Sequence, residues 1–407
     1  MKVLTDKMIA GAFEFKKNKI WDTLLRDNLI ALTFADGSVG YINVFCPLGL
    51  KLPWTMGFAL YRADELYVYD MMYRGPKGVG EVERQVQRNT MSCVRLEFAP
   101  KDEVYDLSAD AIRQYREKHG LHASGKNSFF DITRYTPQLM PQFLTDPKDR
   151  AHTEEALDFL NWLSSHGGGK RLNIFNDKIT CFRAEGKTYK VTEMELPPMK
   201  AYEFPKVPFS NEVVVHRLKG IRKRGVLSCN VVTLSSPVLD EEEDVTCFPW
   251  IFLPYLESED YTIKPSLSRK WGEELVEPLA EELLQMKTVP REIHVINDRT
   301  KNLVEDFCRK TGIRLVMGKS GEIIKDMSDD FYFHMDNLEY VDDDDSFETA
   351  DVKENPQFQE IIHTLSMMTD DMLQTMPSFM RRDIEMLADE LPDDLRRRLQ
   401  RLWGRKK

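Results

Sequence analysis

The chain has 407 residues, of which 42% are hydrophobic and 30% are charged. This length predicts two or three domains, and the composition is typical of a packed globular protein rather than a disordered chain. The 56 basic and 67 acidic residues give a formal net charge of −11, which disfavours a strongly basic nucleic-acid-binding protein. No motif in the sequence identifies a reaction.

The six cysteines are spread along the chain, and none forms a C-x-x-C pair. Scattered thiols in a long chain are typical of a reducing compartment, where we expect them to be buried and inert. The first ten residues show no secretory signal, and the most apolar run, residues 247–256, is far shorter than the ~18 residues of a membrane span. We therefore expect a cytoplasmic protein without membrane contact.

The N-terminal half alternates strand and helix signals. An Asp-Gly turn at Asp36 separates two apolar runs, which predicts a hairpin. Ser108 and Thr153 are expected to open helices, and residues 123–150 to form an ordered loop. After a first helix within residues 1–20, the expected strands are 29–34, 39–45, 56–61, 91–98 and two or three within 171–195. Together these elements predict a mixed, mainly antiparallel domain over residues 1–200.

Four prolines between residues 197 and 208 indicate a domain boundary. The second domain is expected over residues 205–338. Its expected elements are strands at 213–218, 226–234 and 250–256, a helix from Ser266 to about Met286, then a strand at 293–296, a helix at 300–310 and a strand at 313–317. The last three predict an α/β core.

The C-terminal part has a different character. Residues 339–355 include Asp342–Asp345 and are expected to form an acidic linker. Residues 356–407 hold short amphipathic segments and are expected to form a helical tail. The predicted fold class is therefore α+β, with a mixed N-terminal domain, a second domain with an α/β core, and a helical C-terminal tail.

The order of these features resembles an uncharacterised bacterial two-domain family, built from domains of unknown function. The resemblance lies in short motifs within residues 20–335: Gly40-Tyr41-Ile42-Asn43-Val44, Leu60-Tyr61, Gly125-Lys126-Asn127, Phe130, Arg134-Tyr135, Pro137, Pro141, Trp250 to Leu256, Val289-Pro290 and Thr311-Gly312-Ile313-Arg314-Leu315. It implies neither an activity nor catalytic residues. Some relatives carry a C-terminal Cys/His zinc module, but this chain has no cysteine after Cys308, so we expect no metal there and no cofactor.

Polar residues follow two strands of the expected α/β core. Asn297 and Asp298 come after the strand at 293–296, and Lys319 and Ser320 after the strand at 313–317. Ligands collect at the carboxyl ends of strands in open α/β sheets, so one hypothesis is an enzyme or a nucleotide or anion binder with its pocket near these residues. The simpler interpretation is that Asp298 and Ser320 cap helices.

Other chemical motifs are weak. The segment from Gly120 to Asn127 lacks the Ser or Thr of a P-loop and follows an expected helix, so we do not expect it to bind phosphate. The histidines are scattered, and the four consecutive aspartates lack the spacing of a calcium loop. A Ser–His–Asp set stays open, because triads assemble only in three dimensions.

Two basic stretches, residues 217–224 and 396–407, raise a nucleic-acid-binding hypothesis that the acidic balance disfavours. The tail also carries an apolar stripe at helical spacing, formed by Leu395, Leu399, Leu402 and Trp403. Such a stripe packs on its own domain or binds a partner. Because no chemical motif outweighs its structural explanation, the sequence favours a cytosolic binding or regulatory protein that acts through contacts with a protein partner, rather than an enzyme.

Overall fold

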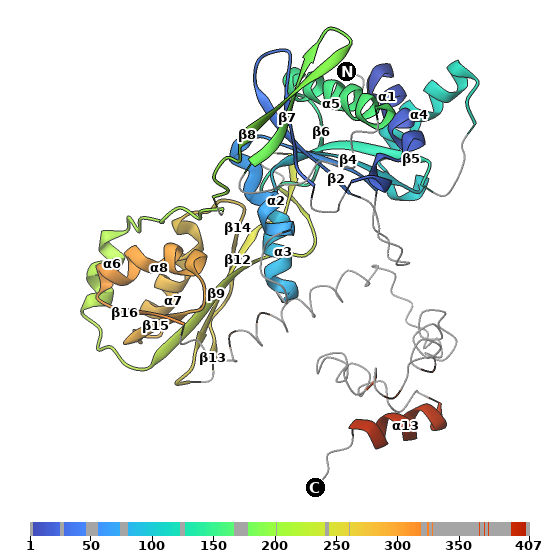
Figure 1. The fold of residues 1–407 in the computed structure, drawn as a ribbon. Coiled ribbons are helices and arrows are strands. Elements are labelled where there is room, and N and C mark those ends of the chain that lie inside the picture. Colours follow the sequence, from blue (N-terminus) through green and yellow to red (C-terminus); the bar gives the residue numbers. More distant parts are fainter. Residues whose placement is uncertain are drawn as a thin grey trace. The chain divides into compact units, whose positions relative to one another are not determined.

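The fold is that of a computed structural model of the chain. It describes residues 3–24, 28–45, 56–73, 80–122, 127–166, 178–200, 202–240, 244–259, 261–318 and 392–403, with single positions at 324, 328, 366, 370 and 373. The chain divides into two compact units, Met1–Asn337 and Leu338–Lys407 (Figure 1). The expected linker at 339–355 lies outside the described residues.

An eight-stranded sheet organises the N-terminal part of the first unit. Its spatial order is β6-β5-β4-β3-β2-β1-β7-β8. The strands are β1 Ile30–Thr33, β2 Val39–Phe45, β3 Met56–Tyr61, β4 Cys93–Ala99, β5 Phe129–Tyr135, β6 Gln142–Phe143, β7 Lys178–Glu185 and β8 Thr188–Glu195. Neighbours run antiparallel except β1 and β7, which are parallel. The prediction of a mixed, mainly antiparallel sheet is confirmed.

Both faces of this sheet are apolar. Helices α1 (Asp6–Asn18), α4 (Asp106–His119) and α5 (Pro147–Ser165) contribute to the core on one face, where Phe58 and Leu96 are fully buried. Helix α2 (Leu66–Tyr73) contributes to the core on the other face, with Tyr61 and Tyr69. Because successive side chains of a strand point to opposite faces, each strand contributes apolar residues to both cores. Short 3-10 turns at 20–22, 63–65 and 101–103 complete this part.

A six-stranded sheet follows, in the order β13-β12-β9-β15-β16, with β14 paired to β12. The strands are β9 Val226–Thr233, β12 Trp250–Leu256, β13 Tyr261–Thr262, β14 Ser266–Ser268, β15 Glu292–Val295 and β16 Arg314–Met317. β15 is parallel to both β9 and β16. Helices α6 (Glu212–Lys219), α7 (Glu277–Gln285) and α8 (Asp298–Thr311) share one core with β9, β12 and β15. The expected α/β core is confirmed. A small hairpin, β10 (Val238–Asp240) and β11 (Val245–Cys247), lies between β9 and β12 in the chain.

Helix α3 (Glu81–Asn89) follows β3 in the chain but packs on the second sheet. Val82 joins Val232, Ile251 and Leu253 in one buried cluster. At its end, the Asn89 Nδ2 group donates to Thr233 Oγ1 at 2.8 Å and to the Leu234 carbonyl at 3.1 Å. The two sheets are therefore joined by a helix that the N-terminal part of the chain contributes.

A second connection runs through the loop between β5 and β6. The Gln138 N–H donates to the Asn89 carbonyl at 2.7 Å, and the Gln138 carbonyl accepts from the Phe248 N–H at 2.8 Å. Met140 N–H donates to the Thr246 carbonyl at 3.0 Å. Gln138 adopts a φ of 68°, which a non-glycine residue adopts only where its surroundings require it. Both of its backbone groups are used in this connection.

The expected strand at 213–218 is wrong, because this segment is helix α6. Its β-branched residues suggested a strand, but the Asn211 side chain accepts from the Val214 N–H and caps a helix. Val214, Val215 and Leu218 are then buried on one helical face. The packing of that face overrides the strand propensity of valine.

Four other local predictions are also corrected. Ser266 does not cap a helix but begins β14, which pairs with β12, and α7 starts only at Glu277. Tyr105, not Ser108, is the N-cap of α4, and Asp146, not Thr153, caps α5. The expected loop at 123–150 contains β5 and β6.

The C-terminal unit contributes one described helix, α13 (Asp393–Trp403), in agreement with the expected helical tail. Among the described residues, no helix combines the length and the apolar character that crossing a bilayer requires.

Candidate functional site

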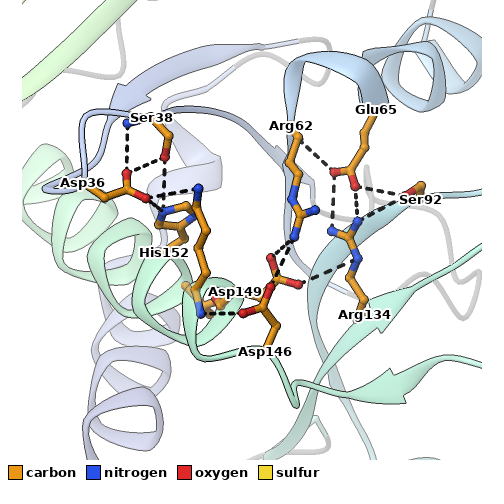
Figure 2. Close-up of polar contacts among 11 residues, drawn as sticks. Asp36, Ser38, Arg62, Glu65, Ser92, Arg134, Asp146, Asp149 and His152 are labelled. Carbon is orange, nitrogen blue, oxygen red and sulfur yellow. Dashed lines mark hydrogen bonds and ion pairs between the residues drawn. The ribbon is translucent and has the colours of Figure 1, made fainter.

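A cavity of about 240 Å³ opens beside the first sheet, where the β1–β2 turn, the end of β3, β5 and the start of α5 meet. Apolar side chains of Phe34, Leu60 and Val94 form part of its wall. The charged side chains that line it are Arg62, Arg134, Asp146, Lys148, Asp149 and His152. Figure 2 shows these groups arranged as two linked sets of polar contacts.

The first set is an ion cluster whose two carboxylates are buried. Glu65 is 3% exposed and Asp149 is 6% exposed. Glu65 accepts from the guanidinium of Arg134, from Ser92 Oγ at 3.0 Å and from the Arg62 backbone N–H at 2.8 Å. Asp149 accepts from Arg62 Nη2 at 2.6 Å and lies 3.9 Å from Arg134 Nε. The two carboxylates therefore alternate with two arginines (Figure 2).

Local structure fixes this cluster. Glu65 is held by a capping box at the 3-10 turn that follows Arg62. Asp149 lies in the first turn of α5, where a carboxylate is stabilised by the helix dipole. Arg134 lies near the end of β5, on the same face as the buried Phe130 and Ile132. Three separate elements thus direct charged groups to one point.

The second set surrounds His152. Asp36 Oδ1 accepts from both the backbone N–H of Ser38 at 2.9 Å and its hydroxyl at 2.5 Å. The other oxygen, Oδ2, lies 3.1 Å from His152 Nε2 and 3.3 Å from Lys148 Nζ. Hydrogen bonds from Ser38, then from His152 and Lys148, hold the pKa of the Asp36 carboxyl well below its usual range. Asp36 is therefore a carboxylate at neutral pH.

The His152 ring is stacked on Phe34, with ring centroids 3.9 Å apart and planes 7° from parallel. Gly40 lies behind Phe34, and a Cβ at this position would collide with the phenyl ring. The glycine therefore makes room for the aromatic stack at the back of the cavity.

Ser38, His152 and Asp36 do not form a catalytic triad. In a triad, one imidazole nitrogen faces the serine and the other faces the carboxylate. Here both Ser38 Oγ, at 3.3 Å, and Asp36 Oδ2, at 3.1 Å, face the same nitrogen, Nε2. The serine hydroxyl instead donates to Asp36. The set stabilises a turn and lacks the geometry of an activated nucleophile.

Thiol chemistry has no support among the described cysteines. Cys93, Cys181, Cys229, Cys247 and Cys308 are free and buried. Burial raises the pKa of the Cys93 and Cys308 thiols to about 12, which keeps them protonated and unreactive. Within the described ranges, no three His, Cys, Asp or Glu side chains are placed to hold a metal ion.

Asn297 and Asp298 follow β15 at the start of α8 and are not part of this cavity's lining. Asn297, rather than Asp298, is the N-cap of α8, because its Oδ1 accepts from the Thr300 N–H. Asn297 Nδ2 donates to the buried Asn230 at 2.8 Å. The Asp298 side chain is 82% exposed and contacts Lys301 at 4.0 Å. Lys319 and Ser320 fall outside the described residues, so the predicted pocket at these four positions stays a prediction.

The apolar stripe of the tail lies on α13. Leu395 and Leu399 are 3% and 4% exposed, and Leu402 is partly buried. The side chain of Trp403 is outside the described residues. Two residues of the stripe are thus already covered in the structure, and the prediction that the stripe binds a partner remains a prediction.

The two basic stretches are partly neutralised by contacts. In the stretch at 217–224, Lys223 donates to the Gly312 carbonyl at 2.8 Å and Arg224 lies 3.5 Å from Glu259. In the stretch at 396–407, Arg398 and Arg401 both contact Asp370, and residues 404–407 are outside the described part. These contacts use some of the charge that the nucleic-acid hypothesis requires.

Sequence reasoning missed the cavity residues. Their positions run from Asp36 to His152, in short groups that are separated by long stretches of sequence. Gly40, Leu60 and Arg134 line the cavity and belong to motifs that carry the family resemblance, and the Asp146-Pro147 pair is a recognisable helix start. None of these signals indicates a shared site.

A family described as a domain of unknown function (DUF6930) matches residues 214–332. The match begins within α6, extends beyond β16 and covers less than a third of the chain. The expectation of an uncharacterised family is confirmed for this segment. Neither a curated protein nor a solved structure matches the chain.

Proposed function

We propose that this chain is a binding protein whose cavity in the first sheet holds a small zwitterionic ligand, with the chemistry of a free amino acid. The observation that carries the proposal is the mouth of the cavity. Arg62, Lys148 and Asp146, each about half exposed, present both signs of charge beside an apolar wall.

The size of the cavity restricts the ligand. Pockets for drug-sized molecules measure ~300–1000 Å³, and this cavity measures about 240 Å³. A nucleotide or a dinucleotide cofactor is too large for it. A molecule of amino-acid size fits this volume.

The charges restrict the ligand further. Three cations and two carboxylates line the cavity, and two further carboxylates, Asp36 and Glu65, lie directly behind them. Counting only the arginines, the lysine and the carboxylates, the net formal charge is +1 for the lining (3 − 2) and −1 for the whole cluster (3 − 4). A nearly neutral site with separated charges favours a ligand that carries both signs over a multiply charged anion such as a nucleotide phosphate.

The functional groups then have distinct roles. Arg62 uses Nη2 for its ion pairs with Asp146 and Asp149, and the exposed remainder of its guanidinium can donate to a ligand carboxylate. Lys148 adds a second positive charge. Asp146 can accept from a ligand ammonium group, and Phe34, Leu60 and Val94 can contact an apolar side chain.

Binding is favoured over catalysis by the state of the polar groups. The buried carboxylates Glu65 and Asp149 are paired with arginines, and Asp36 is held ionised. A general acid or base needs a pKa near the working pH and access to a proton, and these groups are instead committed to fixed contacts.

Titration calorimetry with a panel of amino acids tests the proposal. Each amino acid is compared with its N-acetylated and its amidated form, which remove one charge each. Binding should require both charges. Asp146→Asn should abolish the preference for a free amino group while keeping the α5 cap, because asparagine caps helices as well as aspartate. Lys148→Gln should weaken binding. The matched control is Lys118→Gln, because Lys118 pairs with Asp6 and does not line the cavity.

Absence of binding by every amino acid in the panel contradicts the proposal. Equal binding of the blocked forms contradicts the zwitterionic assignment. A thermal shift gives an independent readout, since a ligand at ~100 times its dissociation constant adds roughly 2.7 kcal/mol to the free energy of unfolding.

We retain contact with a protein partner, through the tail at 356–407, as a second proposal. It is supported by the exposed basic face of the amphipathic helix α13, with Arg397 and Arg401, because Leu395 and Leu399 on the apolar face are already buried. Deleting residues 340–407 should leave both sheets folded and remove the partner from affinity capture. An insoluble truncation would show that the tail is required for folding.

A further inference from the structure

Strand β8 is an exposed edge of the eight-stranded sheet (Figure 1, green). It pairs along one side with β7 over all eight residues, and its other side pairs with no strand that the structure describes. Most of its side chains are exposed, and Val191, near its centre, is 57% exposed. A long exposed edge with a central apolar residue is a template for pairing with another strand.

The register with β7 shows which backbone groups face outward. Glu185 pairs with Thr188 across a two-residue turn, Gly186-Lys187, in which Gly186 has a φ of 64°. The two residues that close such a turn exchange backbone hydrogen bonds. Along an antiparallel pair of strands, hydrogen-bonded pairs of residues alternate with pairs that are not hydrogen-bonded. Thr188 and every second residue after it therefore bond to β7. Tyr189, Val191 and Glu193 direct their N–H and C=O groups to the free edge.

The occupant that β8 fits is a second copy of itself. When two identical strands pair antiparallel about a two-fold axis, one residue lies opposite its own copy at the axis. With Val191 at the axis, Val191 lies opposite Val191, Tyr189 opposite Glu193, and Lys187 opposite Glu195. The outward-facing residues then bond to one another, and each end of the interface gains a pair of opposite charges.

Neighbouring registers are less favourable. An axis at Lys190 would place two lysines opposite each other, and like charges in this position destabilise a pair of strands. An axis at Thr192 would place Val191 opposite Glu193. The register centred on Val191 alone of the three combines an apolar centre with charge complementarity at both ends.

We propose that two copies of this chain associate through β8, centred on Val191, and join their eight-stranded sheets into one. A contact made by one strand from each copy buries less than the ~1,200 Å² of a standard stable interface. The dimer should therefore be weak and concentration-dependent rather than permanent.

Sedimentation velocity of the full-length chain, from ~1 to ~100 µM, measures this association. Lys187→Glu and Glu195→Lys each place like charges opposite one another in the dimer, so each should weaken association by about tenfold or more. The double variant restores opposite charges and should restore the dimer. Within one chain these residues are about 26 Å apart along the strand, so a rescue identifies contact between two copies.

Val191→Pro provides an independent test. It removes an N–H that faces the free edge and leaves the hydrogen bonds to β7, so the chain should fold and remain monomeric. Circular dichroism checks the fold of each variant. A wild-type chain that is monomeric at every concentration overturns the proposal, as does a dimer whose affinity the charge variants leave unchanged.

Discussion

Removing Glu65 should strongly destabilise the fold around the first sheet, because it leaves the largely buried charge of Arg134 without its nearest acceptor. The Arg134 side chain is 18% exposed and the Glu65 side chain 5% exposed. Breaking a buried ion pair by removing one partner costs about 3–5 kcal/mol. Asp149 still lies 3.9 Å from Arg134 Nε and offsets part of the loss, so Glu65→Leu should lower the free energy of unfolding by about 3 kcal/mol.

The double variant Glu65→Leu/Arg134→Met distinguishes the cost of leaving Arg134 unpaired from the cost of losing the contacts of Glu65. Replacing a buried pair by apolar residues of similar volume is often close to neutral, so the double variant should recover most of the stability. Urea unfolding followed by circular dichroism gives the midpoint and slope for each variant. Asp6→Asn, which breaks the exposed pair with Lys118, should change little. A double variant as unstable as Glu65→Leu alone would refute the reasoning.

Three further changes test other parts of the structure. Gly40→Ala forces the Phe34 ring in the cavity wall to move, so it should lower the free energy of unfolding by about 1–3 kcal/mol and weaken amino-acid binding in calorimetry. Asn89→Ala removes two buried hydrogen bonds between α3 and the second sheet, which should cost about 1–3 kcal/mol in urea unfolding. The Glu292 carboxylate accepts from His294 at 3.0 Å and from Arg314, and these contacts hold its pKa below the ordinary value of 4.5. Its contribution to the free energy of unfolding is present above pH 4.5 and is lost as the pH falls through the lowered pKa. In Glu292→Gln, the free energy of unfolding should therefore fall less steeply as the pH is lowered through this range, which urea unfolding at a series of pH values measures.

Local signals were sufficient for most strands of the first sheet. The Asp36-Gly37 turn has its glycine at a φ of 83°, and the hairpin that it predicts is present as β1 and β2. Turn residues and alternating side chains act over a few positions, so one sequence reveals them. The same holds for β15, α8 and β16, where Asn297 caps α8 and Gly312, at a φ of 69°, ends it.

Predictions failed where tertiary packing decided between two local options. The segment 213–218 is rich in valine, yet it is helical because one face of α6 is buried against α7 and α8. Ser266 has the side chain of a helix cap, yet it pairs with β12. The helix and strand propensities of single residues are smaller than the free energy gained by burying an apolar face.

The cavity residues are beyond single-sequence reasoning for a related reason. Arg62 and Asp149 are 87 residues apart, and Arg134 and Glu65 are 69 residues apart. Each residue type is common on protein surfaces, and the information that pairs them is the strand order of the sheet. By contrast, the strand-end hypothesis rested on local order alone, and the structure gives Asn297 the capping role that the sequence had assigned to Asp298.

The ion cluster and the connection between the two sheets share the same two chain segments. Ser92, which donates to Glu65, lies three residues after Asn89, and Arg134 lies four residues before Gln138. Asn89 and Gln138 are themselves hydrogen-bonded to each other, and each also bonds to the second domain. A displacement of Arg134 or Glu65 must therefore be absorbed within a few residues of this connection. The positive φ at Gln138 leaves little freedom to absorb it there, so we expect substitutions at Arg134 or Glu65 to disturb the connection to the second sheet as well.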